Sequence, residues 1–364
     1  MRNLFRGYYQ PTAEELAEIW QTCIFSFDAN ILLNIYCYTP ETRESFFEIL
    51  RRLQDRIWLP HQVAYEYQKN RVYVIGEHIK AYERIDKILT KKFQELKIEI
   101  FSDYRRHPLI NTEQILDKID NAIEAVKTQL QATQNHHPNY LEFDELREVL
   151  SDLFEGKVGQ PYSEAELEQI YQKAEKRFSY RQPPGYKDAN KPVPRSYGDV
   201  ILWFQLIDYA KVQQKPLIFV TDDDKEDWWL KLGGESLEPR PDLIQEILSE
   251  VGGEKFQFYM YHSDQFLNYA EKFFGLPVQP QAVREVREIL QHSAAKRITV
   301  ESDYLRSVGY EPDNQVLEIE FQRGDTYQYR NVPVEVYSEL MNANSHGKYF
   351  NANIKNTYPY QRLS

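Results

Sequence analysis

The chain has 364 residues, of which 42% are hydrophobic and 27% are charged, and its formal net charge is −12. This composition excludes a wholly disordered protein, and the length favours a large domain with an appended module. The negative charge argues against a general nucleic-acid coat but leaves room for a site of different local charge. The only two cysteines, Cys23 and Cys37, are not arranged as a zinc site or a disulfide framework.

The N-terminal residues lack the apolar stretch of a signal peptide, and no stretch approaches the ~18 apolar residues that a spanning helix needs. We therefore expect a cytoplasmic protein in a reducing compartment, without a membrane partner. Residues 69–106 hold ten Lys or Arg against six Asp or Glu, whereas residues 140–180 hold five against ten. The two stretches are predicted to present faces of opposite sign.

Helices and strands are predicted to alternate from the start of the chain. Residues 12–15 form a capping box that begins a helix, and the apolar run 23–27 predicts a strand that ends at Asp28. Thr39-Pro40 begins a second helix, because proline is tolerated at the first helical position. Residues 57–60 predict the next strand.

A long helical segment follows. From residue 61 to about 105 apolar residues recur at helical spacing, which indicates one long helix or two in series. Three more helices are predicted at 111–134, 143–154 and 163–178. Together they predict a helical insertion, at about residues 70–180, between two halves of an α/β sheet.

A proline-rich loop precedes the second half of the predicted sheet. Residues 181–195 contain four prolines, four bases and one acid, which excludes regular structure. The elements predicted after it are a helix at 197–211, a strand at 216–220 that ends at 221–224, a strand at 256–261 and a helix at 263–274. Such alternation predicts a parallel sheet with ligands at the carboxyl ends of its strands.

The composition changes after residue 275. Residues 1–275 are predicted as the first domain, residues 276–299 as a connector and residues 300–364 as a small α+β module. In this module residues 315–321 alternate in strand fashion and residues 326–330 continue after a turn, which predicts a hairpin.

Several acids are predicted to meet at the sheet edge: Asp28, Glu66, Asp199 and the pair Asp222 and Asp223. Phosphodiester hydrolysis needs a nucleophile from water and neutralisation of phosphate charge, which two divalent ions ~4 Å apart supply. Mg²⁺ and Mn²⁺ take oxygen ligands, so converging carboxylates are the required donors. Without cations such a cluster would be costly, because adjacent carboxylates repel one another.

Each acid also has an ordinary structural interpretation. Asp28 could cap a helix, Glu66 could be a solvated helix residue, and Asp199 lies in a first turn, where the helix dipole favours acids. Residues 221–224 could cap a short segment that starts at Lys225. However, independent caps would not need to share one predicted sheet edge.

Other chemistries match the sequence less well. A phosphatase that forms an aspartyl-phosphate needs an Asp where Asn30 stands, and an adhesion-type metal motif needs Ser at Asn30 and Leu32. There is no Gly-rich phosphate loop and no Gly-x-Ser-x-Gly elbow. The pair His136-His137 lies in a polar segment and is predicted to be solvated.

Residues 25–33 (FSFDANILL) resemble the opening motif of PIN-like nucleases, in which a strand ends in Asp before a small residue, Asn or Ser, and an apolar helix. Residues 183–188 (PPGYKD), 197–203 (YGDVILW) and 219–229 (FVTDDDKEDWW) are similar to the large-insertion branch of that superfamily. The resemblance spans roughly residues 20–275 and implies a PIN-like parallel sheet flanked by helices, with a helical insertion.

The resemblance also implies the roles of individual residues. The implied catalytic residues and ligands of Mg²⁺ or Mn²⁺ are Asp28, Glu66, Asp199 and one of Asp222 or Asp223, of which the family's Thr-x-Asp pattern favours Asp223. Supporting roles behind these ligands are expected for Asn30, Asp188, Thr221 and Asp227. Substrate contacts are expected from the basic residues Lys187, Lys191, Arg195 and Lys225.

Residues 307–310, 327–329, 332–333 and 345–351 resemble the KTSC domain, a module found alone and at the end of some lysyl-tRNA synthetases. The module has been suggested to bind RNA. Its last 25 residues contain three bases and no acid, interleaved with aromatic residues, a pattern that suits single-stranded nucleic acid. Candidate contacts are Tyr327, Tyr329, Lys348, Tyr349, Phe350, Lys355 and Arg362. The alternative is an ordinary barrel core with a solvated edge.

These observations predict a divalent-metal-dependent endonuclease that prefers RNA, such as tRNA or another structured RNA. A toxin or antiviral-defence role follows by analogy only, and a regulatory protein or antitoxin is a candidate partner. Two alternatives remain: a non-catalytic scaffold that binds nucleic acid or protein, and a DNA nuclease of flap-endonuclease type. Metal-bound carboxylates read phosphate and not the sugar 2′-hydroxyl, so the sequence does not separate RNA from DNA.

Overall fold

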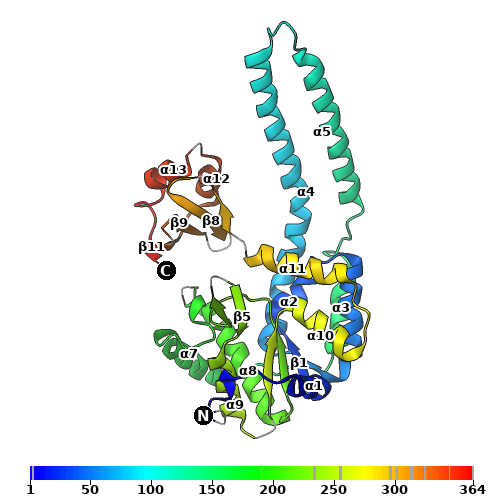
Figure 1. Cartoon of the computed structure of the whole chain (residues 1–364), viewed down its shortest axis with the longest axis vertical. Helices are drawn as coiled ribbons and strands as arrows, with labels where there is room; N and C mark the ends of the chain where they lie inside the picture. Colours follow the sequence, from blue (N-terminus) through cyan, green and yellow to red (C-terminus); the bar gives the residue numbers. More distant parts are fainter. Residues whose placement is uncertain are drawn as a thin grey trace. The chain divides into compact units, whose positions relative to one another are not determined.

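The chain forms two compact units, residues 1–283 and 284–364, in a computed structural model (Figure 1). The structure describes residues 1, 4–189, 191–232, 235–253, 256–294, 297–300, 302–311, 315–323, 325–343 and 345–362. Where a connector was predicted, residues Pro280–Ala294 form helix α11, and the boundary between the units falls inside it.

A parallel sheet lies at the centre of the first unit, in the strand order β2-β1-β3-β6, which confirms the predicted fold class. The strands are β1 (Ile24–Phe27), β2 (Ile57–Trp58), β3 (Leu217–Val220) and β6 (Phe258–Tyr261). Phe25 faces α1 and α10, where its ring meets Trp20 and Phe266. On the other face Phe219 meets Trp228, which packs against Trp203 of α8. The sheet is therefore covered on both faces, as its apolar strands require.

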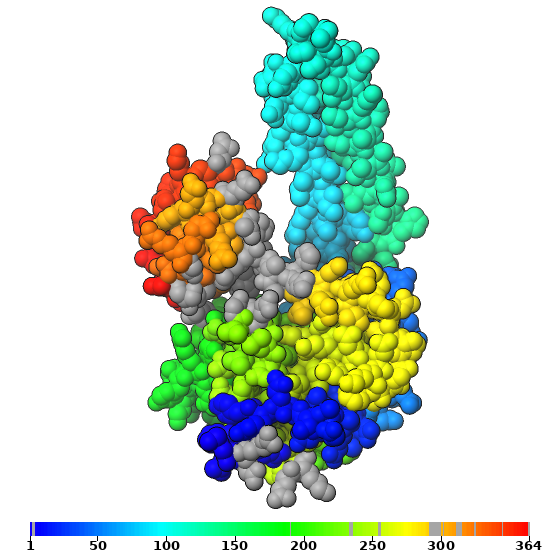
Figure 2. Space-filling view, in the orientation of Figure 1, coloured from blue at the N-terminus to red at the C-terminus, as the bar shows by residue number. Residues whose placement is uncertain are grey.

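The helices that surround the sheet are α1 (Ala13–Thr22), α2 (Ala29–Asn34), α3 (Pro40–Arg52), α8 (Gly198–Gln213), α9 (Pro241–Val251) and α10 (Ser263–Phe274). The predicted capping box of α1 is present, since the Thr12 and Glu15 side chains each accept a backbone N–H of the other residue. Helix α9 and the hairpin of β4 (Trp229–Leu232) with β5 (Glu235–Pro239) were not predicted. The N-terminal helix η1 (Arg6–Tyr8) lies against α9, and this N-terminal segment is blue in Figure 2.

The predicted helical insertion consists of α4 (His61–Tyr104), α5 (Thr112–Asn135), α6 (Glu145–Phe154) and α7 (Glu164–Ser179). Helix α4 is continuous, because it contains no proline and only one glycine. Its first turns lie in the core through Val63 and Tyr67, and the rest pairs with α5 as a hairpin (Figure 1). Ion pairs between Lys97 and Asp120 (2.6 Å) and between Lys127 and Asp86 (3.6 Å) connect the two helices.

The second unit is built on an antiparallel sheet in the order β11-β10-β9-β8-β7. Its elements are β7 (Arg297–Thr299), β8 (Leu305–Glu311), β9 (Val316–Phe321), β10 (Thr326–Tyr329), α12 (Val334–Asn342), α13 (His346–Asn353) and β11 (Tyr360–Arg362). Strands β9 and β10 form the predicted hairpin. Within the described residues of both units, no helix combines the length and apolar character that crossing a membrane requires.

Candidate active site

The edge at the carboxyl ends of β1 and β3 holds Asp28 and Thr221 side by side. Asp28 follows β1 and also caps α2, since its Oδ1 accepts the Ala29 N–H at 2.6 Å. Its Oδ2 accepts from Asn30 Nδ2 at 2.8 Å and from Thr221 Oγ1 at 2.6 Å. The Thr221 hydroxyl in turn accepts the Asp223 N–H at 3.1 Å. The cap interpretation of Asp28 and its place in the acidic cluster are therefore both satisfied by one side chain.

The two neighbouring acids after β3 differ in their surroundings. Asp222 accepts hydrogen bonds from the Ser263 N–H (2.9 Å) and from Asn34 Nδ2 (3.1 Å), so it joins the start of α10 to the end of α2. Asp223 lies beside Lys225, with 2.7 Å between its Oδ2 and the Lys225 Nζ. Asp222 is thus occupied by structural partners, and Asp223 belongs to the group of acids around Lys225.

Glu66 and Asp199 lie at the starts of two helices that pack together. The Gln62 N–H donates to Gln205 Oε1 at 2.9 Å, which joins the first turn of α4 to α8. Gln62 Nε2 also donates to Glu66 Oε1 at 2.6 Å. A Cβ added at Gly198 would lie only 2.8 Å from that same Glu66 oxygen. Glycine at this position therefore lets Glu66 approach the helix start that carries Asp199.

The proline-rich loop is fixed to the site by Asp227. Its Oδ2 accepts the N–H groups of Gly185 (2.9 Å) and Lys187 (3.1 Å). Gly185 has φ +96°, and a Cβ there would lie 2.7 Å from Val200 Cγ2, so the turn favours glycine on both counts. Asp227 is completely buried, and its Oδ1 has no hydrogen-bond partner among the described residues.

Lys225 lies at the centre of three acids. Its Nζ is 2.7 Å from Asp223 Oδ2, 3.0 Å from Asp188 Oδ2 and 3.3 Å from Asp199 Oδ2. Lys191 also pairs with Asp188, at 2.9 Å. Segments from β3, the proline-rich loop and α8 therefore converge on one ammonium group.

Burial dominates the electrostatics of these acids. It raises the pKa of Asp28 to about 7, with repulsion from Asp223 and Glu66 adding to the shift. Burial also raises the pKa of Glu66, and it raises that of Asp199 well above its usual value.

Asp188 and Lys225 show the opposite balance. Burial would raise the pKa of Asp188, but Lys225 and Lys191 outweigh it and lower that pKa. Burial would likewise lower the pKa of Lys225, but Asp199, Asp223 and Asp188 raise it well above its usual value. Lys225 is therefore a stable cation held by the cluster.

The remaining predicted bases lie on the outside of this cluster. Lys187 Nζ pairs with Glu226 at 3.2 Å, and Arg195 is exposed. Substrate contact by these residues stays a prediction, as do the roles of Asn30 and Thr221 in supporting a ligand set.

The carboxylate oxygens supply the donors that Mg²⁺ and Mn²⁺ prefer. Even so, no group of three His, Cys, Asp or Glu side chains is arranged to hold a metal within the described ranges. The Lys225 ammonium lies between the carboxylates of three of the acids. The partnerless Asp227 Oδ1 in the same region is a buried acceptor that a cation would satisfy.

In the second unit two of the predicted contact residues are buried. Phe350 and Tyr329 are 0% and 2% exposed and belong to its hydrophobic core, so their rings offer no face for stacking on a base. Tyr349 is partly buried and donates its hydroxyl to Glu339 at 2.6 Å. The other candidates are placed at or near the surface: Tyr327 is partly buried, Lys348 and Lys355 are exposed, and Arg362 pairs with Asp325 at 2.5 Å.

Sequence reasoning missed several residues that build the site. Gln62, Gln205 and Gly198 position Glu66, and Asn34 and Ser263 hold Asp222 away from the cluster. Side chains alternate in direction along an extended chain, which would place Thr221 and Asp223 on one side and Asp222 on the other. That alternation could have separated the two acids from the sequence alone.

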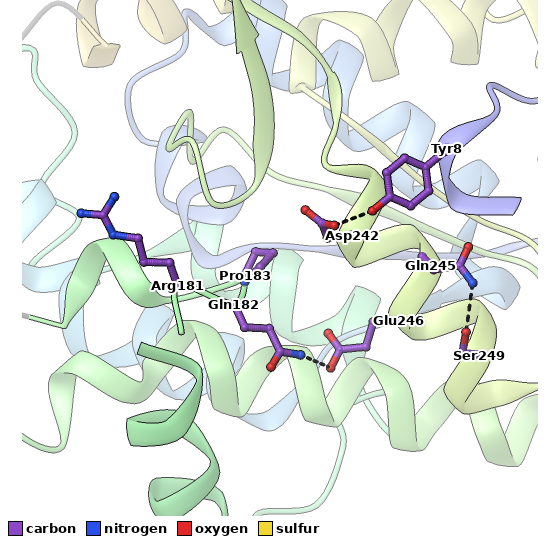
Figure 3. A pocket seen from close by; sticks show the side chains of 8 residues that line it. All are labelled: Tyr8, Arg181, Gln182, Pro183, Asp242, Gln245, Glu246 and Ser249. Carbon is purple, nitrogen blue, oxygen red and sulfur yellow. Dashed lines mark hydrogen bonds between the residues drawn. The ribbon is translucent and has the colours of Figure 1, made fainter. Parts of the chain in front are cut away.

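A hollow of about 390 Å³ lies elsewhere, between η1, the proline-rich loop and α9 (Figure 3). Tyr8 donates to Asp242 at 2.8 Å, and Gln182 donates to Glu246 at 3.4 Å across it. Its lining contains none of the predicted site residues.

The first unit is thus an α/β domain whose sheet edge carries buried acids. The family described as "PIN like domain" matches residues 24–243, which is more than half of the chain, and the chain therefore belongs to this family. Such domains generally bind nucleic acid, and membership points to a hydrolase of nuclease type. The KTSC domain matches residues 301–358, so the second unit is a KTSC domain.

Individual relatives match shorter stretches. An uncharacterized protein of Stutzerimonas stutzeri is 45% identical over 69 residues, which cover 19% of this chain and 97% of that protein. A lysine–tRNA ligase of a Nostoc species is 42% identical over 64 residues, but these cover only 11% of the ligase. A crystal structure of a KTSC domain protein from Yersinia pestis is 39% identical and covers 19% of this chain and 96% of that chain, with a TM-score of 0.18.

Proposed function

We propose that this protein is a divalent-metal-dependent endonuclease whose expected substrate is RNA. The observation that carries the proposal is the convergence of buried acids from distant segments at one sheet edge. Burial raises the pKa values of Asp28, Glu66 and Asp199, so keeping these groups charged is unfavourable without cations. Strongly perturbed carboxylates that have no role in the core are typical of functional sites.

The donor chemistry of the site fits Mg²⁺ or Mn²⁺. The ion would be held by Asp28, Glu66, Asp199 and Asp223. When bound there, it would lower the pKa of a coordinated water and neutralise negative charge on the phosphate. Thr221 and Asn30 hold the Asp28 carboxylate in place through hydrogen bonds of 2.6 and 2.8 Å.

The chain's own groups contribute to the chemistry in two further ways. Lys225 supplies a fixed positive charge beside the reacting phosphate. Arg195 and Lys187 lie on the loop that leads into Asp199 and would contact the substrate backbone.

The test compares the full chain with two variants on labelled RNA and DNA strands of the same sequence. The wild type should cleave RNA with Mn²⁺ or Mg²⁺ and not with EDTA. Asp199→Asn should lower the rate at least ~100-fold at unchanged thermal stability, since it removes a ligand charge and keeps the shape. Glu18→Gln, which changes an exposed acid of α1, is the control and should cleave normally.

Equal cleavage by Asp199→Asn would overturn the assigned site. Faster cleavage of DNA than of RNA would favour the flap-endonuclease alternative. Nucleic-acid binding without cleavage under any metal condition would favour a scaffold.

We further propose that the KTSC domain positions substrate and supplies no catalytic group. A chain that ends after Ala294 keeps α11 whole and removes the later strands. It should cleave a generic single strand at a comparable rate and discriminate less among structured RNAs such as tRNA. Complete loss of cleavage with the first unit folded would assign the domain to the active site instead.

A further inference from the structure

Among the described residues of the first unit, Lys225 contacts more acids than the other ion-paired lysines do. Its Nζ lies within 3.3 Å of carboxylate oxygens from Asp188, Asp199 and Asp223. Lys231, a lysine of similar exposure six residues later, pairs with Asp224 alone at 2.7 Å. The three carboxylates surround the ammonium group as carboxylate ligands surround a metal cation.

The backbone holds Lys225 in this place. Its N–H donates to Asp223 Oδ1 at 3.2 Å, while its Nζ returns to the Oδ2 of the same residue at 2.7 Å. Asp223 itself is fixed through the Thr221 hydroxyl. The ammonium is therefore placed by the same short segment that carries the metal-ligand candidates.

The other side of the cluster has no such cation. Asp28 accepts its hydrogen bonds from neutral donors, namely the Ala29 N–H, the Asn30 amide and the Thr221 hydroxyl. Glu66 accepts from the neutral amide of Gln62. Neither is ion-paired with a Lys or Arg in the part of the chain that the structure describes. The Lys225 ammonium thus pairs with Asp188, Asp199 and Asp223, whereas Asp28 and Glu66 accept hydrogen bonds from neutral groups.

We propose that the Lys225 ammonium takes the place of a second divalent ion, so that Asp28, Glu66, Asp199 and Asp223 hold a single Mg²⁺ or Mn²⁺ beside it. This inference rests on the proposed metal dependence. Two-ion hydrolysis places positive charge on both sides of the phosphate, and a fixed ammonium supplies one of these charges without a second ion. A point charge with three donors suits this position, because it contacts several carboxylates at once.

The experiment counts Mn²⁺ bound per full-length chain at saturation, by calorimetry and by electron paramagnetic resonance of the free ion. The wild type should bind one ion. Lys225→Met, which keeps the length and removes the charge, should bind two, because Asp188, Asp199 and Asp223 then lack a cation. Lys225→Arg restores a cation and should bind one, and Lys231→Met is the matched control that should also bind one.

Two ions on the wild type would overturn the inference, since Lys225 would then leave the cluster when metal binds. One ion on a folded Lys225→Met would also overturn it. If Lys225→Met does not fold, the wild-type count and Lys225→Arg still decide. One bound ion without cleavage would contradict the proposed function and leave this inference standing, whereas cleavage with two bound ions would do the reverse.

Discussion

The two units differ in whether the burial of their candidate site residues is energetically favourable. In the PIN-like unit, acids that burial disfavours are kept at the sheet edge, and their pKa values are raised as a result. In the KTSC unit, conspicuous aromatic residues such as Phe350 are used in the core, where burial favours them. Acids whose burial costs folding free energy indicate a functional site, whereas aromatic residues whose burial is favourable indicate a role in stability.

The largest expected effect tests the structural half of this comparison. Phe350→Ala should destabilise the KTSC unit by roughly 3–5 kcal/mol, because it leaves a cavity in a buried core. The change should leave cleavage of a generic strand nearly unaltered. Chemical denaturation of the full chain measures it, and Tyr360→Ala, whose ring is 58% exposed, is the milder control. Unchanged stability with lost RNA binding would make Phe350 a contact residue after all.

Asp28 tests the functional half through pH. In the folded state the pKa of Asp28 is about 7, above the ordinary value of 3.8. Between about pH 4 and pH 7 the folded state therefore keeps a proton on Asp28 that the unfolded state has lost. The unfolding free energy that Asp28 contributes should therefore fall as pH rises from about 4 to 7 in metal-free buffer, by a few kcal/mol at most. Asp28→Asn should lack this fall, so the two stability curves should cross or diverge. Parallel curves from pH 4.5 to 7.5 would show that Asp28 is not strained.

Close packing around Glu66 gives a smaller effect. Gly198→Ala places a Cβ 2.8 Å from Glu66 Oε1, so the carboxylate must shift, and we expect roughly a 10- to 100-fold loss of cleavage. Gly76→Ala is the control, because that glycine has nothing within 4 Å of the added Cβ. It should stabilise α4 by up to about 1 kcal/mol and leave the rate alone. Equal rates for both variants would remove Glu66 from the active site.

The proline-rich loop should give the smallest change. Replacing Lys187, Lys191 and Arg195 by Ala should flatten the dependence of RNA binding on salt by about 0.7 per lost phosphate contact. Two of the lysines already pair with acids, so we expect less than the full effect of three contacts. Lys211→Ala, at the opposite end of α8, should leave the slope unchanged. If the triple variant keeps the wild-type slope, the substrate path lies elsewhere.

The strands and most helices of the first unit could be predicted because their signals are local. Asp28 and Thr221 follow apolar strands, and a parallel sheet places such ends on one edge. The hairpin of β4 and β5 gave no clear alternation, and helix α9 was overlooked although Pro241 marks its start and Leu243 and Ile247 its buried face.

The contacts within the site could not be predicted from the sequence, because they join segments that are far apart in the chain. Lys225 was predicted to contact substrate, and only the three-dimensional placement of the loop and α8 reveals the carboxylates around it. The same limit applied to Phe350. The sequence around an aromatic residue that is flanked by basic residues does not show whether its ring is buried in the core or stacks on a nucleobase. Contacts between distant segments are determined by tertiary packing, whereas the hydrophobic periodicity of a single sequence predicts only local helices and strands.

The most direct test of the central claim measures the melting temperature of wild type and Asp28→Asn at pH 7.5 against Mn²⁺ concentration. Asp28→Asn should be more stable in EDTA, because it removes a buried charge. The wild type should gain stability with Mn²⁺, by about 2.7 kcal/mol at a hundredfold excess over its dissociation constant, and the variant should gain less. A melting temperature of the wild type that does not respond to Mn²⁺ or Mg²⁺ would contradict the account.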